Sequence, residues 1–353
     1  MTRLKNIDSV ANCTPLPESC SHAECVAAPD MGSREDLLRR FTPTPHAVNL
    51  RLMQRTVRLE TNHKSVLDLA MKFFERHQHG EAGDPEFVWR LISEPDPKMQ
   101  STAVPLTAFS DAGLQYVNIG QRSFLAVDLV RREAVGYLAK AFLEGEARLR
   151  DRPPLDILFC MTAASLRLTA MSGACVGLED RGVMVFGPPN SGKTTASYLA
   201  AKLGLEFQAD QVVFLEMQGD TVRAWGDPFP AVFRPETIEF LPEIRCSAHR
   251  STYADLSFYY FEKSSLQSRW AKPIIPVCSL FLDRSTACET QLHEISREDA
   301  ASRLRNCMLF EEDSRFEAQT LAAITGLTEK RAYSLRYDTD PKIAATFIEK
   351  MLR

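Results

Sequence analysis

The chain lacks a long hydrophobic run. No window approaches the ~20 consecutive apolar residues that a helix needs to cross a bilayer, although 44% of the 353 residues are hydrophobic. The opening residues, MTRLKNIDSV, carry charges where a secretory signal needs an apolar stretch. We therefore expect a cytoplasmic protein with no membrane segment.

An excess of charge of one sign is also missing. The sequence has 42 basic and 46 acidic residues, which gives a net charge of -4. So balanced a composition provides no general attraction to nucleic acid or to anionic lipid. We expect neither a nucleic-acid partner nor a membrane partner.

An even number of cysteines, as a disulfide framework needs, is missing as well. The chain has nine cysteines, an odd number, and Cys160, Cys175 and Cys278 stand in apolar surroundings that suit reduced, buried thiols. A disulfide framework is not indicated. A group near the amino terminus could be imagined as a zinc site, but it lacks the second ligand pair, so we interpret its thiols as incidental. That group comprises Cys13, His22, Cys20 and Cys25.

The length suggests two domains. Residues 1–44 mix Pro, Ser, Cys and charge without periodicity, which predicts a disordered leader. Residues 45–154 predict a small α+β module, and residues 155–353 an α/β domain. Within the module we expect a strand or hairpin at 48–60, helices at 65–77 and 133–150, and strands at 87–92, 115–119 and 123–128.

In the second part, an apolar helix is expected at 155–168, followed by one strand at 171–178 and a turn. The remaining predicted strands are 182–186, 205–209, 212–217 and 277–282, and the predicted helices are 193–203, 297–307 and 341–352. Gly204 is expected to end the helix 193–203.

The motif with the clearest chemistry is the pattern G-x4-G-K-[ST]. Its glycines let main-chain N–H groups converge on phosphate oxygens, its lysine reaches the β and γ phosphates, and its hydroxyl binds Mg²⁺. An apolar strand precedes the loop and a helix follows it, so that the positive helix end faces the anion. We expect ATP with Mg²⁺ to bind at these residues: Gly187, Pro188, Pro189, Asn190, Ser191, Gly192, Lys193, Thr194 and Thr195.

A carboxylate near the γ phosphate is the other requirement of phosphoryl transfer. Asp210 follows the predicted strand 205–209, whose carboxyl end should lie beside Gly187 if the two strands are close neighbours. We predict Lys193 and Asp210 as catalytic residues, and Thr194 and Asp210 as metal ligands. The alternative is that Asp210 only opens a turn.

Two further side chains have open interpretations. Arg234 follows a Pro-rich loop and could neutralise charge on a transferred phosphate, but a surface arginine at the start of a helix is the simpler reading. Asp227 could supplement the metal site, and a Gly-Asp-Pro turn explains it equally well.

The segment 171–217 resembles the catalytic domain of HPr kinase/phosphorylase and its relatives. The likeness comprises a strand, a turn, GPPNSGKT, a helix ending in LGL, and QADQVVFLE. Looser similarity continues through FRPETIEFLPEI (233–244), 277–283 and 331–336. These relatives share a P-loop superfamily with ATP-dependent phosphoenolpyruvate carboxykinase. The resemblance implies a P-loop α/β domain of the HPr-kinase/PEP-carboxykinase type, and it makes a homo-oligomer plausible.

The chain departs from that family at two positions. The family has an Asp-Asp pair where this chain has Asp210 and Gln211, and a His at the position of Ser172. Neither Gln nor Ser takes up a proton near pH 7. The segment linked to phosphorolysis is not recognisable, so reversal of the reaction is not expected.

The resulting hypothesis is an ATP-dependent kinase of the HPr-kinase-like type. It would phosphorylate a serine or another hydroxyl on a protein, peptide or small molecule, with an acceptor that the sequence does not identify. The alternative is a nucleotide-binding regulatory or scaffold protein with weak or no turnover. A third class, an ATPase or GTPase switch, is disfavoured because the chain has no guanine-reading N-K-x-D segment, although adenine recognition leaves no comparable signature.

Overall fold

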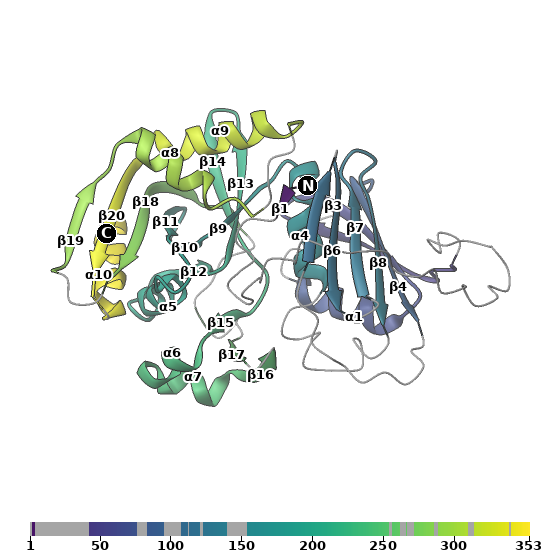
Figure 1. Ribbon diagram of the computed structural model, residues 1–353, viewed down its shortest axis with the longest axis horizontal. Helices are drawn as coiled ribbons and strands as arrows, with labels where there is room; N and C mark the ends of the chain where they lie inside the picture. The colour runs from purple at the N-terminus through teal and green to yellow at the C-terminus, as the bar shows by residue number, and fades with distance from the viewer. Residues whose placement is uncertain are drawn as a thin grey trace, which may run out of the picture.

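The structure is a computed structural model in which strands and helices form two adjoining bodies, the first built mainly of consecutive strands (Figure 1). It describes residues 2–3, 42–75, 83–94, 107–111, 113–120, 123–139, 154–253, 256–261, 266, 272–285, 289–309, 314–338 and 340–353. The mixed α/β class expected from the sequence is confirmed. The amino-terminal cysteines and histidine that we interpret as incidental, and nearly all of the predicted leader, lie outside the described residues.

An eight-stranded sheet forms the first body. Its order is β1 (Thr2–Arg3), β5 (Thr107–Asp111), β6 (Leu114–Gly120), β7 (Ser123–Asp128), β8 (Glu133–Ala139), β4 (Phe87–Glu94), β3 (Arg55–Thr61) and β2 (His46–Leu52). The β3–β4 and β4–β8 pairs are parallel and the others antiparallel. The predicted hairpin and the strands near 87, 115 and 123 are confirmed. The helix predicted at 65–77 is α1 (Lys64–Phe73).

The helix predicted at 133–150 is wrong over the residues that the structure describes. Residues 133–139 form β8, in which Ala134, Gly136 and Leu138 are buried and alternate with more exposed neighbours. A two-residue period fits a strand with one buried face. Pairing with β4 on one side and β7 on the other outweighed the helical spacing of the apolar residues. Residues 140–150 lie outside the described part.

The second body is built on a six-stranded sheet. Its order is β12 (Glu206–Ala209), β10 (Ala174–Leu178), β11 (Arg181–Phe186), β18 (Ile275–Arg284), β20 (Arg331–Tyr337) and β19 (Gln291–Glu294). β11, β18 and β20 run parallel. β12 and β11 both run antiparallel to β10, so they point the same way.

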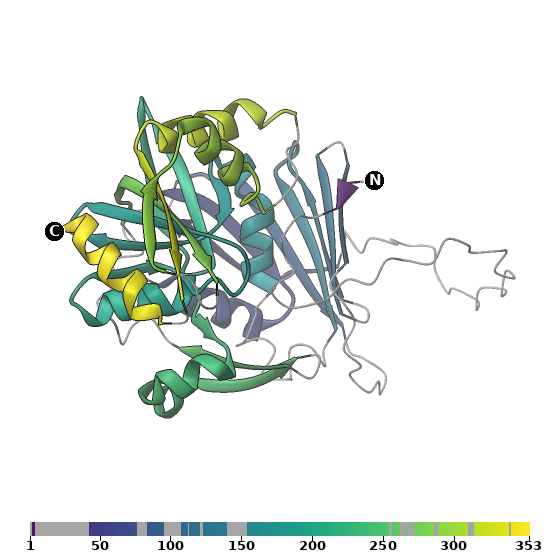
Figure 2. The same cartoon turned by 60° about the vertical axis from the view of Figure 1, so that its left-hand side comes forward.

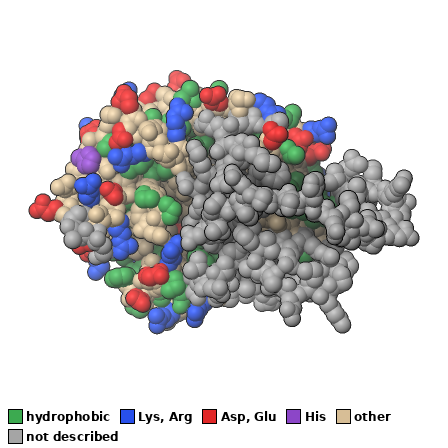
Figure 3. Space-filling view, in the orientation of Figure 1, with side chains coloured by type: hydrophobic (Ala, Val, Ile, Leu, Met, Phe, Trp, Pro, Cys, Tyr) green, Lys and Arg blue, Asp and Glu red, His purple; other side chains and the backbone are tan. Residues whose placement is uncertain are grey.

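Helices cover both faces of this sheet (Figures 1 and 2). α5 (Lys193–Lys202) and α10 (Pro341–Leu352) pack on one face, while α8 (Arg297–Arg305) and α9 (Glu317–Thr328) pack on the other. Gly204 adopts a φ of 91° just after α5, so the predicted glycine stop is confirmed. In Figure 3 acidic and basic side chains are interspersed over this body.

Two three-stranded sheets complete the second body. One consists of β14 (Thr221–Gly226), β13 (Val212–Gln218) and β9 (Thr169–Ser172). The other consists of β15 (Ala231–Phe233), β17 (Leu256–Phe261) and β16 (His249–Tyr253), and the short helices α6 (Pro235–Phe240) and α7 (Pro242–Ser247) pack against it.

The single strand predicted at 171–178 is wrong, because the chain divides there into β9 and β10 of two different sheets. Gly173 separates them. A Cβ at Gly173 would come within 2.9 Å of the Phe186 ring, and the Gly173 N–H donates to the carbonyl of Gln211 at 3.0 Å. The glycine therefore lets the backbone pass close to β11 and change sheets.

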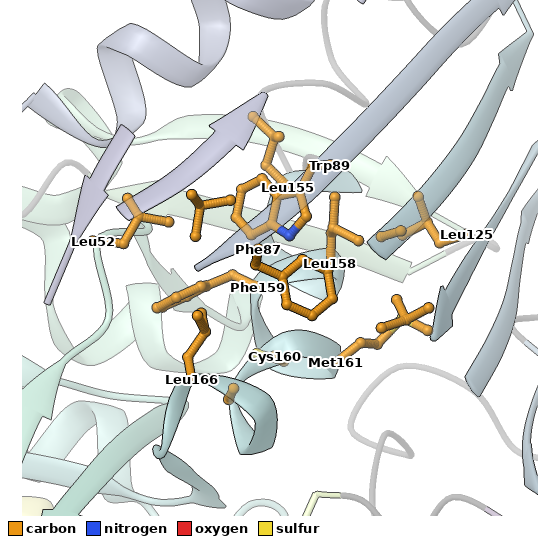
Figure 4. Packing of buried hydrophobic residues seen from close by; sticks show 14 of the residues in the cluster. Leu52, Phe87, Trp89, Leu125, Leu155, Leu158, Phe159, Cys160, Met161 and Leu166 are labelled. Atoms are coloured by element: carbon orange, nitrogen blue, oxygen red, sulfur yellow. The ribbon is translucent and has the colours of Figure 1, made fainter. Parts of the chain in front are cut away.

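α4 (Pro154–Thr162) joins the two bodies through an apolar core. Figure 4 shows Phe159 of α4 beside Phe87 and Trp89 of the first body. Phe159 is fully buried and contacts the rings of Phe74 and Trp89 in the first body and of Phe214 in the second. α4 is shorter than the predicted helix 155–168, since a 3-10 turn (Ala164–Leu166) and Arg167 with a φ of 60° follow it. The division at 154/155 stays a prediction.

A buried polar link supports the same junction. The Arg55 guanidinium donates to the Leu166 carbonyl at 3.0 Å and to Glu216 at 2.7 Å. The Trp225 indole donates to the other oxygen of Glu216 at 2.8 Å. Within the described residues no helix has the length and apolar character to cross a membrane.

Replacing Phe159 with Ala tests the core that joins the bodies. We expect the free energy of unfolding to fall by about 3–5 kcal/mol, because a large buried ring is lost from a packed cluster. Phe240→Ala is the control, since Phe240 is 63% exposed, and it should change stability by no more than ~0.5 kcal/mol. Urea denaturation followed by tryptophan fluorescence measures both, and similar effects of the two variants would contradict the role of Phe159.

Candidate nucleotide-binding site

The loop 187–194 follows the carboxyl end of β11, the first of the three parallel strands, and leads into α5. Gly187 adopts a φ of 148°, Asn190 of 66° and Gly192 of 89°. A Cβ at Gly187 would lie 2.6 Å from the Leu282 carbonyl oxygen and equally close to Ser191 Oγ, so glycine is required there. The strand, loop and helix that the motif needs are therefore present in the predicted order.

Residues of the loop differ in exposure. Pro188, Pro189 and Asn190 are exposed, whereas Ser191 is only 2% exposed. Thr194 and Thr195 lie half-buried in the first turn of α5. An anion above this helix start would face the positive end of the helix dipole.

The Lys193 side chain folds back over its own loop. Its ammonium donates to the carbonyl oxygens of Gly187 at 2.8 Å and of Pro188 at 3.0 Å. Burial lowers the pKa of the Lys193 ammonium, and the nearby Cys307 and Asp210 oppose that shift. The cation is thus held where a phosphate bound to the loop would meet it.

Asp210 is 1% exposed and follows β12 directly. The main-chain N–H of Val232 donates to its Oδ2 at 3.2 Å. β12 points the same way as β11 with only β10 between them, so Asp210 lies at the same sheet edge as Gly187. The Asp210 carboxylate opposes the lowering of the Lys193 pKa by burial.

The two positions that depart from the kinase family also lie at this edge. Ser172 ends β9 and its N–H donates to the Cys307 carbonyl at 2.7 Å. Gln211 accepts a hydrogen bond from the Gly173 N–H through its carbonyl oxygen. Ser172 also pairs with Val212 in the β9–β13 ladder. Backbone pairing therefore places Ser172 beside the start of β13, the strand that follows Asp210 and Gln211.

Cys307 is a residue of this site that sequence reasoning missed. Burial raises the pKa of the Cys307 thiol to about 11, against the opposing effects of Lys193 and of the Gly187 N–H. The thiol donates to the Arg303 carbonyl at 3.4 Å. Cys307 stands 120 positions after Gly187, so no local pattern could have indicated the contact.

Tyr337 is a second residue near the loop that sequence reasoning missed. Its hydroxyl, at the end of β20, donates to the Ser191 carbonyl at 2.6 Å. Burial raises the pKa of the Tyr337 phenol to about 12, so the hydroxyl remains a donor at neutral pH.

The other predicted candidates are less well defined. Asp227 is 3% exposed and accepts the Phe229 N–H at 3.1 Å, as the turn interpretation requires. Arg234 stands at the N-cap position of α6. Among the described residues no three His, Cys, Asp or Glu side chains form a group that could hold a metal ion.

The chemistry of the loop nevertheless fits a phosphate with Mg²⁺. Ser191 Oγ is buried and has no hydrogen-bond partner among the described residues. Lys193 supplies a cation, and the Thr194 hydroxyl and Asp210 carboxylate are the hard oxygen ligands that Mg²⁺ prefers. Such a metal would complete its shell with phosphate oxygens and water, as magnesium sites commonly do.

Comparison with known proteins gives little further information. No family model matches the sequence, and no curated protein matches it. Among solved structures, the chain is similar to the HPr(Ser) kinase/phosphatase from Coxiella burnetii, at 9% identity and a TM-score of 0.27. The matched region covers 51% of this chain and 94% of that chain. So distant a similarity carries no argument about function.

Ser191→Ala tests whether the buried hydroxyl is a phosphate ligand. Deleting an unsatisfied hydroxyl should stabilise the unliganded protein by about 1 kcal/mol, while the affinity for a triphosphate should fall. Ser197→Ala is the matched control, because Ser197 Oγ on α5 is also buried without a partner among the described residues. Thermal unfolding and titration calorimetry measure both effects. Equal affinities of the two variants would exclude Ser191 as a ligand.

Proposed function

We propose that the chain binds ATP with Mg²⁺ at the loop 187–194 and transfers the γ-phosphoryl group to a hydroxyl. The acceptor would be a serine or another hydroxyl on a protein, a peptide or a small molecule. One observation carries the proposal: a parallel strand, a loop closed by Gly187 and Gly192, and a helix that begins at Lys193 occur together. This arrangement supports the phosphate cradle that the sequence motif predicts.

Binding follows from the loop. Main-chain N–H groups between the two glycines would contact the β and γ phosphates, helped by the dipole of α5. Lys193 would exchange its bonds to the Gly187 and Pro188 carbonyls for bonds to phosphate oxygens. Thr194 and Asp210 would hold Mg²⁺, which neutralises charge on the transferred group. Thr195 lies next to them in the first turn.

Transfer would proceed by in-line displacement. The acceptor oxygen forms a bond to the γ phosphorus while the bond to the β,γ-bridging oxygen breaks, and ADP leaves. Asp210 accepts the proton of the acceptor hydroxyl, directly or through a water. Lys193 stabilises the charge on the transferred group throughout.

A second candidate function is nucleotide binding without turnover, as in a regulatory or scaffold protein. Gln211 and Ser172 favour it, because they stand where the kinase family has a second carboxylate and a histidine. Both side chains can hydrogen-bond, but neither takes up a proton near neutral pH. The cytoplasmic location and a homo-oligomeric assembly stay predictions.

Lys193→Ala tests the proposed site. We expect the affinity for Mg-ATP to fall about ten- to hundredfold, because charge-assisted hydrogen bonds to phosphate are lost, and transfer of labelled phosphate to an acceptor in lysate to disappear. Lys202→Ala is the control, since Lys202 lies exposed in the last turn of the same helix. Calorimetry and radiolabel incorporation give the two readouts. Labelling that survives in Lys193→Ala would rule out this loop as the donor site.

Gln211→Asp distinguishes a weak kinase from a binding protein. Restoring a second carboxylate beside Asp210 should raise any residual phosphoryl transfer or ATP hydrolysis, because it adds a metal ligand or a base. Gln218→Asp, at the exposed end of strand β13, serves as the control for added charge. The rate of ADP release is measured at saturating Mg-ATP. No gain in Gln211→Asp with intact nucleotide binding would contradict a catalytic role at position 211.

A further inference from the structure

The hydroxyl of Tyr337 is positioned by the strand that carries it. β20 lies beside β18 in parallel pairing, with Tyr337 opposite Arg284 at the carboxyl end. The Ser285 N–H donates to the Tyr337 carbonyl at 3.0 Å, and the tyrosine is 1% exposed. Its ring belongs to the same apolar cluster as Ala196 and Ala200 of α5. The phenol therefore has little freedom to leave the loop.

Its partner is a carbonyl inside the loop 187–194. Tyr337 Oη lies 2.6 Å from Ser191 O, a short hydrogen bond between two buried groups. A Cβ added to Gly192 would come within 2.5 Å of the same hydroxyl. Position 192 therefore requires glycine for two reasons: a side chain would occupy the space of the Tyr337 hydroxyl, and the φ of 89° is one that other residues rarely adopt.

The bond fixes the orientation of one peptide group. The Ser191–Gly192 peptide is planar and trans, so the Ser191 C=O and the Gly192 N–H point in opposite directions. Because Tyr337 holds the carbonyl on its own side, the Gly192 N–H points to the opposite side. In a phosphate-binding loop the N–H before the lysine is one of the donors that converge on the anion.

We propose that Tyr337 is a positioning residue of the nucleotide site, which holds the Ser191–Gly192 peptide with its N–H directed at the bound phosphate chain. This inference rests on the proposed function and extends it to a residue that does not touch the ligand. A donor oriented before binding costs no reorganisation when the anion arrives. Tyr337 therefore contributes to affinity for the phosphate chain itself, whatever base or acceptor accompanies it.

Tyr337→Phe keeps the ring and removes the hydroxyl. We expect the dissociation constants of Mg-ATP and of inorganic tripolyphosphate to rise together, by about three- to tenfold, since one hydrogen bond no longer orients the donor. Tyr198→Phe is the matched control: Tyr198 on α5 is also buried and donates to Glu243 at 3.3 Å, away from the loop. It should leave both dissociation constants unchanged. Calorimetry well below the melting temperature makes loss of stability irrelevant to the comparison.

A second measurement uses the unaltered protein and does not depend on the folding of a variant. With glycine labelled by nitrogen-15, the Gly192 amide resonance should shift on addition of magnesium tripolyphosphate, while that of Gly219 in the distant β13–β14 turn should not. An unshifted Gly192 amide at saturation, or equal affinities of Tyr337→Phe and wild type, would overturn the role of Tyr337. Wild-type protein that binds neither ATP nor tripolyphosphate would instead overturn the proposed function.

Discussion

The second body depends on one constraint at the start of α5, where the backbone turns tightly between Gly187 and Gly192. Gly187 and Gly192 both hold conformations that a side chain would block, the first against the Leu282 carbonyl and the second against the Tyr337 hydroxyl. The Lys193 ammonium bridges two carbonyls of the loop, those of Gly187 and Pro188. β11, which precedes the loop, and β12, which precedes Asp210, both end at the same edge of the six-stranded sheet.

Several elements that are far apart in the sequence bring residues to the loop. β12 delivers Asp210, β9 delivers Ser172, and the segment after α8 delivers Cys307, although these residues belong to different sheets or to none. Short main-chain hydrogen bonds join them, such as that from Ser172 to Cys307. The site therefore depends on the meeting of two sheets more than on any one element. The larger N-terminal sheet joins them through α4 and the Arg55–Glu216 pair.

Sequence reasoning recovered those parts of this arrangement that are local. The strand before the loop, the helix after it and the glycine stop at Gly204 follow from periodicity and turn chemistry within about twenty residues. It failed where tertiary pairing decided the outcome: 133–139 has helical spacing of apolar residues but is enclosed between two strands, and Gly173 divides one apolar run between two sheets. Tyr337 and Cys307 could not have been found, because only the folded sheet brings them to the loop.

The bond from Tyr337 to Ser191 spans 146 positions of sequence, and this has a consequence for biosynthesis. At the usual 5–20 residues per second, a ribosome needs roughly 7 to 30 s to travel from one partner to the other. During that interval the loop 187–194 has been synthesised, but Tyr337, which orients the Ser191–Gly192 peptide, has not. Competence to hold a triphosphate would thus be acquired late in translation, after most of the second body has been made.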